Sequence, residues 1–247
     1  MAFIDKNLQL SGLAGAVQDL DPATAAAGLF STDYLDRYDD EQASAMADGN
    51  NMYGRVTILE EDVLSGTANA TVDFQLVSLP VLSGATATTL LNVTTVDEAA
   101  VITKTAHGIP VDARGTRVTA VNPVTGYAAA TSYYLDDITV NQFTLYTKPK
   151  EAGGVVVSAQ ASAETMDLVI QPEVLGSSGP VPFQRLIKDY STVAFRANPT
   201  GILQPIQRYV YMFCKPSADL TSGKALFHLT LEDGERRTHY RSGFTVE

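Results

Sequence analysis

Residues 70–80 read ATVDFQLVSLP, a run in which apolar and polar side chains alternate. The apolar side chains of this alternation are Val72, Phe74 and Leu76. Successive side chains of a β-strand point to opposite faces of the sheet. The pattern therefore predicts a strand of an antiparallel sheet with one face buried and the other in solvent.

The same alternation returns near the end of the chain. Residues 165–171 read TMDLVIQ and residues 225–231 read ALFHLTL. Residues 208–214, RYVYMFC, are apolar on both faces, as in a strand that is covered on both sides. The 18 glycines and 11 prolines lie at short intervals between such runs. Short β-favouring runs separated by turn residues are typical of an all-β sandwich or barrel.

The middle of the chain is richer in turns than its flanks. Strand-like runs at 117–121, 132–135 and 143–146 are separated by turn sequences, among them NPVTG at 122–126. Such closely spaced hairpins are sufficient for a small β-barrel.

We expect this middle block to be an insertion, because the strand patterns before and after it share one style. The predicted division is a sandwich in two parts, 1–94 and 165–247, with an inserted β-barrel module at 95–164. Insertions are tolerated at exposed loops, where they leave buried backbone undisturbed. The two ends of the module should then lie close together.

Five other segments give local expectations. Residues 3–10 predict a first strand, and the Ala-rich residues 22–28 predict one or two helical turns after a capping aspartate. Residues 31–52 are acidic and predict a solvated loop with a short helix. Residues 176–180 predict a loop, and residues 238–246 predict a last strand.

Charge and composition argue against several classes of protein. The 247 residues include 28 acidic and 17 basic side chains, for a net charge of −11. Binding to nucleic acid without sequence preference needs clustered Lys and Arg, so we expect no nucleic-acid partner. No apolar run approaches the roughly 18 residues of a membrane-spanning helix. The start of the chain lacks the pattern of a secretory signal, and the single cysteine, Cys214, cannot form an intramolecular disulfide.

The sequence lacks the motifs of common catalytic and metal sites. The histidines His107, His228 and His239 do not have the spacing of a zinc site, and no Cys-x-x-Cys is present. The acidic run 33–48 lacks the ligand spacing of a calcium loop. Residues 176–179, GSSG, lack the lysine of a phosphate-binding loop, and no Gly-x-Ser-x-Gly occurs. We therefore predict no catalytic, cofactor-binding or metal-binding residue, and we do not expect an enzyme.

Three features have a functional alternative beside the structural one. Cys214 is expected to be a buried, inert thiol rather than a nucleophile. The acids Glu60, Glu61 and Asp62 are expected to form a solvated rim, and the alternative is a carboxylate pair for glycoside hydrolysis. His107-Gly108 predicts a turn in which glycine takes a positive φ, and the alternative is a ligand or proton site.

Both ends of the sequence resemble one family of phage proteins. Residues 3–11, FIDKNLQLS, are similar to the opening of the capsid cement (decoration) proteins of short-tailed Bordetella-type bacteriophages. The strand–turn–strand pattern of 208–214, 221–223 and 224–231 resembles their closing pattern. The resemblance implies a jelly-roll β-sandwich, so the expected fold is an all-β jelly roll with an inserted small β-barrel. The chain departs from the family in its greater length and in a tail after Leu231.

The middle block resembles a small β-barrel module that is found inserted in phage tail and surface proteins. The similarity lies in TAHG at 105–108, SYYL at 132–135 and NQFTL at 141–145. In that family the module is a spacer or display unit with no known catalytic residues, so the resemblance implies none here.

The two resemblances together imply a virion structural protein. It would be a capsid decoration or cement protein that binds the outside of the major capsid shell and stabilises it. Its partners would be the major capsid protein and further copies of itself, as a homodimer or homotrimer, without nucleic acid or membrane. It would be made in the host cytoplasm and lie on the outer capsid surface of the virion.

Two other functions remain open from the residues alone. One is a carbohydrate- or receptor-binding β-sandwich of a phage tail or host-surface structure. The other is an enzyme such as a glycosidase or lyase. The apolar N-terminal arm, residues 2–20, also has two interpretations: it packs on its own sandwich, or it adds as a strand to a neighbouring chain.

Overall fold

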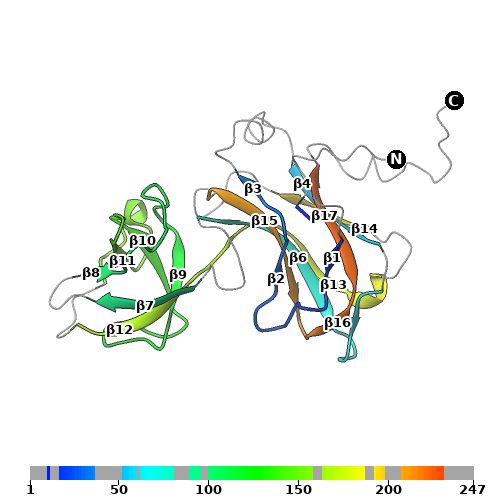
Figure 1. The fold of residues 1–247 in the computed structure, drawn as a ribbon, viewed down its shortest axis with the longest axis horizontal. Coiled ribbons are helices and arrows are strands. Elements are labelled where there is room, and N and C mark those ends of the chain that lie inside the picture. The colour runs from blue at the N-terminus through cyan, green and yellow to red at the C-terminus, as the bar shows by residue number, and fades with distance from the viewer. Residues whose placement is uncertain are drawn as a thin grey trace. The chain divides into compact units, whose positions relative to one another are not determined.

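The computed structural model describes residues 10–11, 17–36, 52–59, 62–80, 89–95, 100–157, 163–186, 192–197 and 207–230. Regular structure in these ranges is almost entirely β-strand, which confirms the predicted all-β class. The chain divides into two compact units (Figure 1). One unit comprises Met1–Ser78, Val174–Ile202 and Tyr209–Glu247, and the other comprises Leu79–Glu173 with Leu203–Arg208.

The first unit contains two main β-sheets. The strands of the first sheet, in spatial order, are β1 (Gln18–Asp19), β17 (Lys224–Thr230), β4 (Met52–Ile58) and β14 (Thr192–Ala197). The strands of the second sheet are β13 (Glu173–Pro182), β6 (Thr71–Leu79), β15 (Tyr209–Pro216) and β2 (Leu29–Phe30), with β3 (Leu35–Asp36) also paired to β15. A separate pair joins β5 (Leu64–Ser65) to β16 (Leu220–Ser222), and the 3-10 helix η3 (Phe183–Arg185) follows β13.

The order of these strands is that of a jelly roll. The strands on the main paths of the two sheets, in chain order, are β1, β2, β4, β6, β13, β14, β15 and β17. The first sheet then runs first, eighth, third, sixth, and the second sheet runs fifth, fourth, seventh, second. Paired Greek keys interleave strands in this way, so the predicted jelly-roll sandwich is confirmed.

The second unit is inserted at the one connection among these eight strands that stays within a sheet. All other connections cross between the sheets, whereas β6 and β13 are neighbours. The N–H of Phe183 donates to the carbonyl of Ala70 at 3.3 Å, and the N–H of Phe74 donates to Ser178 Oγ at 3.0 Å. These contacts make the two strands antiparallel, so the end of β6 lies beside the start of β13.

Alternating side chains from both sheets form the core of the sandwich. Val72, Phe74 and Leu76 are fully buried, as the pattern of residues 70–80 predicts. Phe227 of β17 packs against Phe74 from the facing sheet, with ring centroids 6.2 Å apart. The strands therefore bury one face each, and their other faces carry the surface of the sandwich.

Part of the N-terminal arm lies on its own sandwich. The N–H of Leu10 donates to the carbonyl of Phe227 at 2.9 Å, and the N–H of Phe227 donates to Ser11 Oγ at 2.7 Å. Leu10 is fully buried. These two residues extend the β1 edge of the first sheet, and the expected strand at 3–10 otherwise lies outside the described residues.

The second unit contains a closed six-stranded antiparallel barrel, whose strands are green to yellow-green in Figure 1. Its strands, in order around the barrel, are β10 (Ser132–Asp136), β11 (Gln142–Tyr146), β8 (Val101–Thr103), β7 (Thr89–Thr95), β12 (Thr165–Ile170) and β9 (Arg117–Val121). A 3-10 helix, η2 (Lys150–Ala152), follows β11. Ile102, Leu135, Phe143 and Leu168 are fully buried inside the barrel.

The barrel is longer than the expected module at 95–164. Thr95 and Glu164 do lie together, since the N–H of Thr95 donates to the carbonyl of Glu164 at 2.8 Å. However, β7 and β12 are paired beyond this point to Thr89 and Val169, and the compact unit begins at Leu79. Both strands alternate as the sandwich strands do, so their pattern did not indicate that they close the barrel.

Two local expectations are wrong. Residues 22–28 contain turns and a bridge between Thr24 and Gly28 instead of a helix. Residues 176–180 lie in β13 instead of a loop, because an edge strand can accommodate Gly, Ser and Pro where its outer side needs no partner. The expected short helix within 31–52 and the expected strand at 238–246 lie largely or wholly outside the described residues.

Replacing residues 80–172 with a short Gly/Ser hairpin loop should leave the sandwich folded. The ends of the deleted segment are adjacent across the β6–β13 pair, and loop-closure entropy changes slowly with length. We expect the deletion protein to retain β-sheet circular dichroism and a single cooperative unfolding transition in urea. Loss of the cooperative transition would contradict the division into two units.

Candidate functional site

His107 has a structural position in the barrel. Its ring is 7% exposed and packs edge-on against Phe143, with ring centroids 5.5 Å apart. Its Nδ1 accepts a hydrogen bond from the N–H of Ile109 at 3.1 Å, which leaves the proton of the neutral ring on Nε2. Burial lowers the pKa of His107, and Gly108 takes the expected positive φ of 74°. The ring therefore anchors the turn before Ile109 and does not face another titratable side chain in the contacts described.

Cys214 is fully buried in β15. Burial raises the pKa of its thiol to about 12, and the charge of Asp73 acts in the same direction. A thiol with this pKa is protonated at neutral pH and is a poor nucleophile.

Searches for metal clusters and membrane spans were negative over the described ranges. No group of three or more His, Cys, Asp or Glu residues there could hold a metal ion. None of the helices there is long and apolar enough to cross a membrane.

The GSSG stretch at 176–179 holds a carboxylate of its own sheet. Ser177 Oγ donates to Asp73 Oδ1 at 2.7 Å, and Gln75 Nε2 donates to Asp73 Oδ2 at 2.6 Å. Ser178 Oγ also lies 3.3 Å from Asp73 Oδ1. The hydroxyl groups of this stretch thus join β13 to β6, which accounts for them without a phosphate ligand.

The acidic residues of the sequence are only partly within the described residues. Glu60 and Glu61 lie outside them. Asp62 is exposed, and its carbonyl accepts a hydrogen bond from Ser222 Oγ at 2.7 Å. Of the acidic run at 33–48, residues 33–36 lead into and form the short β3.

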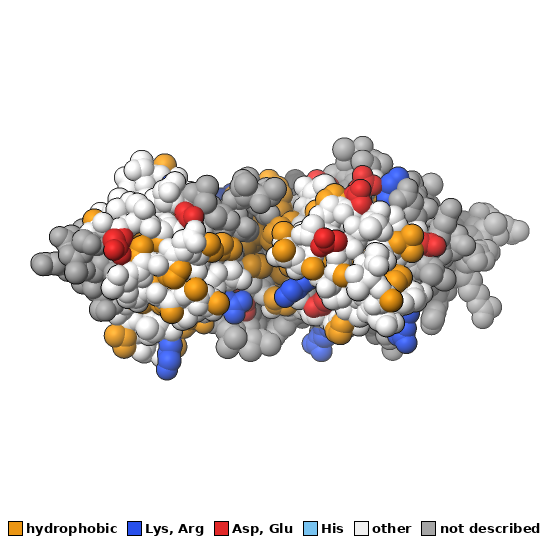
Figure 2. Space-filling model, turned by 90° about the horizontal axis from the view of Figure 1, so that it is seen from below, with side chains coloured by type: hydrophobic (Ala, Val, Ile, Leu, Met, Phe, Trp, Pro, Cys, Tyr) orange, Lys and Arg blue, Asp and Glu red, His pale blue; other side chains and the backbone are white. Residues whose placement is uncertain are grey.

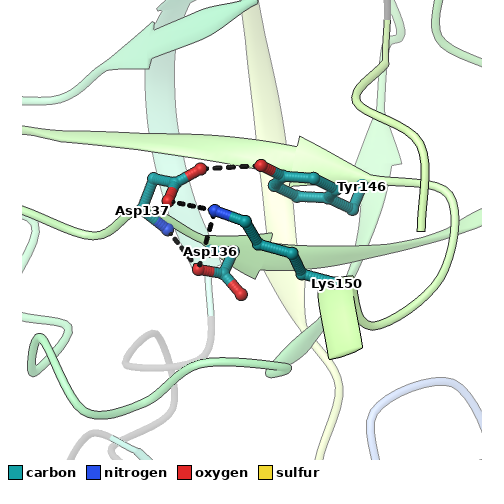
Figure 3. Close-up of polar contacts among 4 residues, drawn as sticks. All are labelled: Asp136, Asp137, Tyr146 and Lys150. Carbon is teal, nitrogen blue, oxygen red and sulfur yellow. Dashed lines mark hydrogen bonds and ion pairs between the residues drawn. The ribbon is translucent and has the colours of Figure 1, made fainter. Parts of the chain in front are cut away.

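A polar network at the β10–β11 turn of the barrel is shown in Figure 3. Lys150 Nζ lies 2.5 Å from Asp137 Oδ1 and 3.9 Å from Asp136 Oδ1. Tyr146 donates its hydroxyl proton to Asp137 Oδ2 at 2.7 Å, and Lys150 Nζ lies 5.4 Å from the centroid of the Tyr146 ring. Hydrogen bonds from Lys150 and Tyr146 lower the pKa of Asp137. The network fixes a turn in which Asp137 has a φ of 51°, so its role is structural.

Five aromatic rings form a continuous row on the face of β15 that is opposite the sandwich core. We define the aromatic row as Phe30, Tyr34, Tyr209, Tyr211 and Phe213. Ring centroids are 4.6 Å apart for Phe213–Phe30, 5.8 Å for Phe30–Tyr211, 5.6 Å for Tyr211–Tyr34 and 5.4 Å for Tyr34–Tyr209. Tyr211 at the centre is 1% exposed, whereas Tyr34 is 39% exposed. The row therefore offers an aromatic surface mainly at its Tyr34 end.

The sequence pattern contained only half of this row. The alternation at 209–213 places an aromatic side chain at every second position of one strand. The other two rings come from the opposite end of the chain, where Met212 N donates to Ser31 Oγ at 3.0 Å across 181 positions of sequence. Gly28 is needed here, because a Cβ at this position would lie 2.3 Å from the ring of Phe213.

The outer face of the first sheet carries several basic side chains. Strand register places Asp19 beside Lys224, places Leu226, Thr57 and Thr192 in one row, His228, Arg55 and Ala194 in the next, and Thr230, Tyr53 and Arg196 in the last. These residues include three Lys or Arg and one Asp, in a chain with a net charge of −11. We define this set of residues as the cationic face.

Arg55 and His228 are adjacent on the cationic face, and each has an atom without a partner. His228 is 5% exposed and its Nδ1 has no hydrogen-bond partner. Arg55 Nε is buried and also lacks a hydrogen-bond partner. Burial, and then the charge of Arg55, lower the pKa of His228 to about 4, so its ring is neutral at pH 7. The charge at the centre of this face therefore belongs to Arg55.

The side of the molecule shown in Figure 2 has a mixed surface. Acidic and basic side chains stand apart from one another there, among hydrophobic and uncharged ones. This matches a sequence that is 18% charged and 45% hydrophobic. Surfaces of this composition are typical of protein–protein contacts rather than of contacts with a phosphate backbone.

The fold defines the class of the chain: an all-β protein with a jelly-roll sandwich and an inserted closed barrel. No protein-family model matches the chain, and no curated protein sequence matches it. The candidate site therefore consists of two outer sheet faces, the aromatic row and the cationic face.

Lys150→Met should raise the pKa of Asp137, because Lys150 supplies the strongest interaction that lowers it. In the wild type this lowered pKa stabilises the barrel above the ordinary pKa of an aspartate, and the contribution is lost as the pH falls through the folded-state value. NMR titration of the Asp137 carboxyl carbon measures the shift. The exposed Lys148 provides the control Lys148→Met, which should not move it. Identical curves for wild type and Lys150→Met would exclude this role of Lys150.

His228→Gln should make the stability of the sandwich less dependent on pH below neutrality. An unfolded histidine takes up a proton near pH 6.5, whereas folded His228 does so only near pH 4. Between these values the unfolded state binds more protons, so the wild type loses at most about 1.4 kcal/mol per pH unit from this group. Urea unfolding from pH 7 to pH 4.5 measures the difference. Parallel profiles for the two proteins would show that His228 does not titrate in this way.

Proposed function

We propose that the chain is a virion structural protein, a decoration protein that binds the outside of a major capsid shell and stabilises it. The observation that carries the proposal is the jelly-roll sandwich with a complete second barrel between two neighbouring strands. This is the architecture that the resemblance to phage cement proteins and to inserted phage barrel modules implies. Fold alone does not determine function, so the proposal also rests on those sequence similarities.

The separation of the two units suits such a role. Because the barrel is inserted between β6 and β13, both sheets of the sandwich remain intact and their outer faces stay available for contacts. The barrel buries its own core of residues such as Phe143 and Leu145, so it can serve as a display or spacer unit without support from the sandwich core. Many copies with modest contacts each would add up to a large stabilisation of a shell.

The proposed partners are the major capsid protein and further copies of this chain. The proposed place is the outer surface of the capsid, after synthesis in the host cytoplasm. A net charge of −11 favours this outer position over the lumen, because an acidic protein is repelled by packaged DNA. We propose no catalytic step for this protein.

The aromatic row favours a second candidate function, a carbohydrate- or receptor-binding sandwich. Sugars stack on exposed aromatic rings, and Tyr34 is 39% exposed beside Tyr209. Asp33 and Asp36 flank this end of the row in the sequence and could accept hydrogen bonds from sugar hydroxyls. In this case the isolated protein would bind a glycan saturably, and Tyr34→Ala would abolish the binding.

The purified protein should bind to expanded, DNA-free shells of the virus whose genome encodes it. Cosedimentation measures the binding, and electron microscopy of the decorated shells should show added density on their outer surface. Decorated shells should also resist heat better than bare ones. The deletion protein without residues 80–172 should lose the projecting part of the density, which locates the barrel. Failure of the intact protein to bind shells, together with saturable glycan binding that depends on Tyr34, would favour the second candidate instead.

A further inference from the structure

We propose that copies of this chain associate head to tail, with the cationic face of one sandwich receiving an acidic end of the next. The inference rests on the self-association proposed above and does not depend on binding to the shell. It assigns the contact to two surfaces of the same sandwich, and it specifies the chemistry between them as Arg–carboxylate pairing.

The centre of the cationic face lacks a counter-charge. Arg55 stays charged at neutral pH, yet its Nε–H is buried without an acceptor. The neighbouring His228 is 95% buried by the measure that gives it 5% exposure, and its Nδ1 has no partner either. A buried guanidinium is normally paired, and a carboxylate is the group that best fits its planar donors. The site is therefore complete only when a carboxylate approaches from outside this sheet.

An acidic end of the sandwich supplies carboxylates of this kind. We define it as Asp21, Asp62 and Asp219, which are all exposed. The backbone brings them together around β16. Leu20, next to Asp21, donates its N–H to the carbonyl of Gly223 at 2.8 Å, and the carbonyl of Asp62 accepts from Ser222 Oγ at 2.7 Å.

Asp219 completes this end, since it directly precedes β16 in the chain. Its Oδ1 accepts the N–H of Ala25 at 2.9 Å, and Ser65 Oγ donates to its carbonyl at 2.8 Å. The loop is thus held by hydrogen bonds in the isolated chain, and its second carboxylate oxygen remains for a partner. A preorganised carboxylate loses less conformational freedom when it binds.

Charge complementarity selects a second copy of this chain as the partner. The chain carries −11 overall, whereas the cationic face carries three basic residues and one acidic residue. Two copies therefore repel each other in most orientations and attract when this face meets an acidic surface. A twofold contact of two cationic faces would place Arg55 and Arg196 of both copies together. The contact must then be heterologous, which produces a ring or an open chain of copies.

Sedimentation velocity of the intact protein at low ionic strength tests the association. We expect the weight-average sedimentation coefficient to rise with concentration in about 20 mM salt and to fall to the monomer value in about 0.5 M salt, where charges are screened over a few Å. Arg55→Gln and the exposed Arg196→Gln should each weaken association about tenfold. Lys148→Gln removes the same charge from the barrel and should associate like the wild type.

Mixing of variants distinguishes the two kinds of contact. Asp21→Asn combined with Asp219→Asn should weaken association, as Arg55→Gln does from the other side. A mixture of Arg55→Gln with the double variant should recover a heterodimer, because one copy retains the cationic face and the other retains the acidic end. Circular dichroism melts establish that each variant is folded, and Arg196→Gln provides a face variant at an exposed site.

Three results would overturn the inference. The first is a wild type that stays monomeric at about 20 mM salt and high concentration, including one that binds shells through Arg55, which would assign the face to the shell. The second is association that is unchanged in Arg55→Gln and Arg196→Gln. The third is a dimer that no mixture of variants restores, since this is the behaviour of a twofold contact.

Discussion

The contact between Phe74 and Phe227 joins the two sheets of the sandwich, and the remaining surfaces depend on it. Burying an aromatic ring of this size contributes about 1.5–3 kcal/mol, so both strands are held with these rings inward. Because side chains alternate along a strand, this orientation also decides which residues face outward. A shift of either strand by one residue would bury Arg55 or Asp73 and expose the core. The core therefore determines the chemistry of the outer faces.

Much of the fold could be predicted because burial on one side of a sheet leaves a period of two in the sequence. Residues 70–80, 165–171 and 225–231 all show this period, and each forms a strand near the predicted bounds. The period does not say which sheet a strand joins. Residues 89–95 and 165–170 were therefore assigned to the sandwich, although they close the barrel. The jelly-roll order came from the family resemblance and not from periodicity.

The candidate surfaces were harder to predict, because each is assembled across strands that are distant in the sequence. Arg55 gains its neighbour His228 only through the register of β4 with β17, and Tyr209 meets Tyr34 only through the pairing of β3 with β15. Local patterns contain no information about such register. The same reason explains residues 176–179: their composition indicated a loop, but the serines bond to Asp73 on a strand far away in the chain.

The place of the barrel also bears on how the chain folds as it is synthesised. The sandwich cannot close until late, because Gln18 pairs with Ala225 near the far end of the chain. The barrel, within Leu79–Glu173, depends on contacts that are complete well before β14, β15 and β17 leave the ribosome. Domains that are synthesised first generally fold first. A folded barrel then holds the end of β6 beside the start of β13, which shortens the slow search for long-range strand pairing.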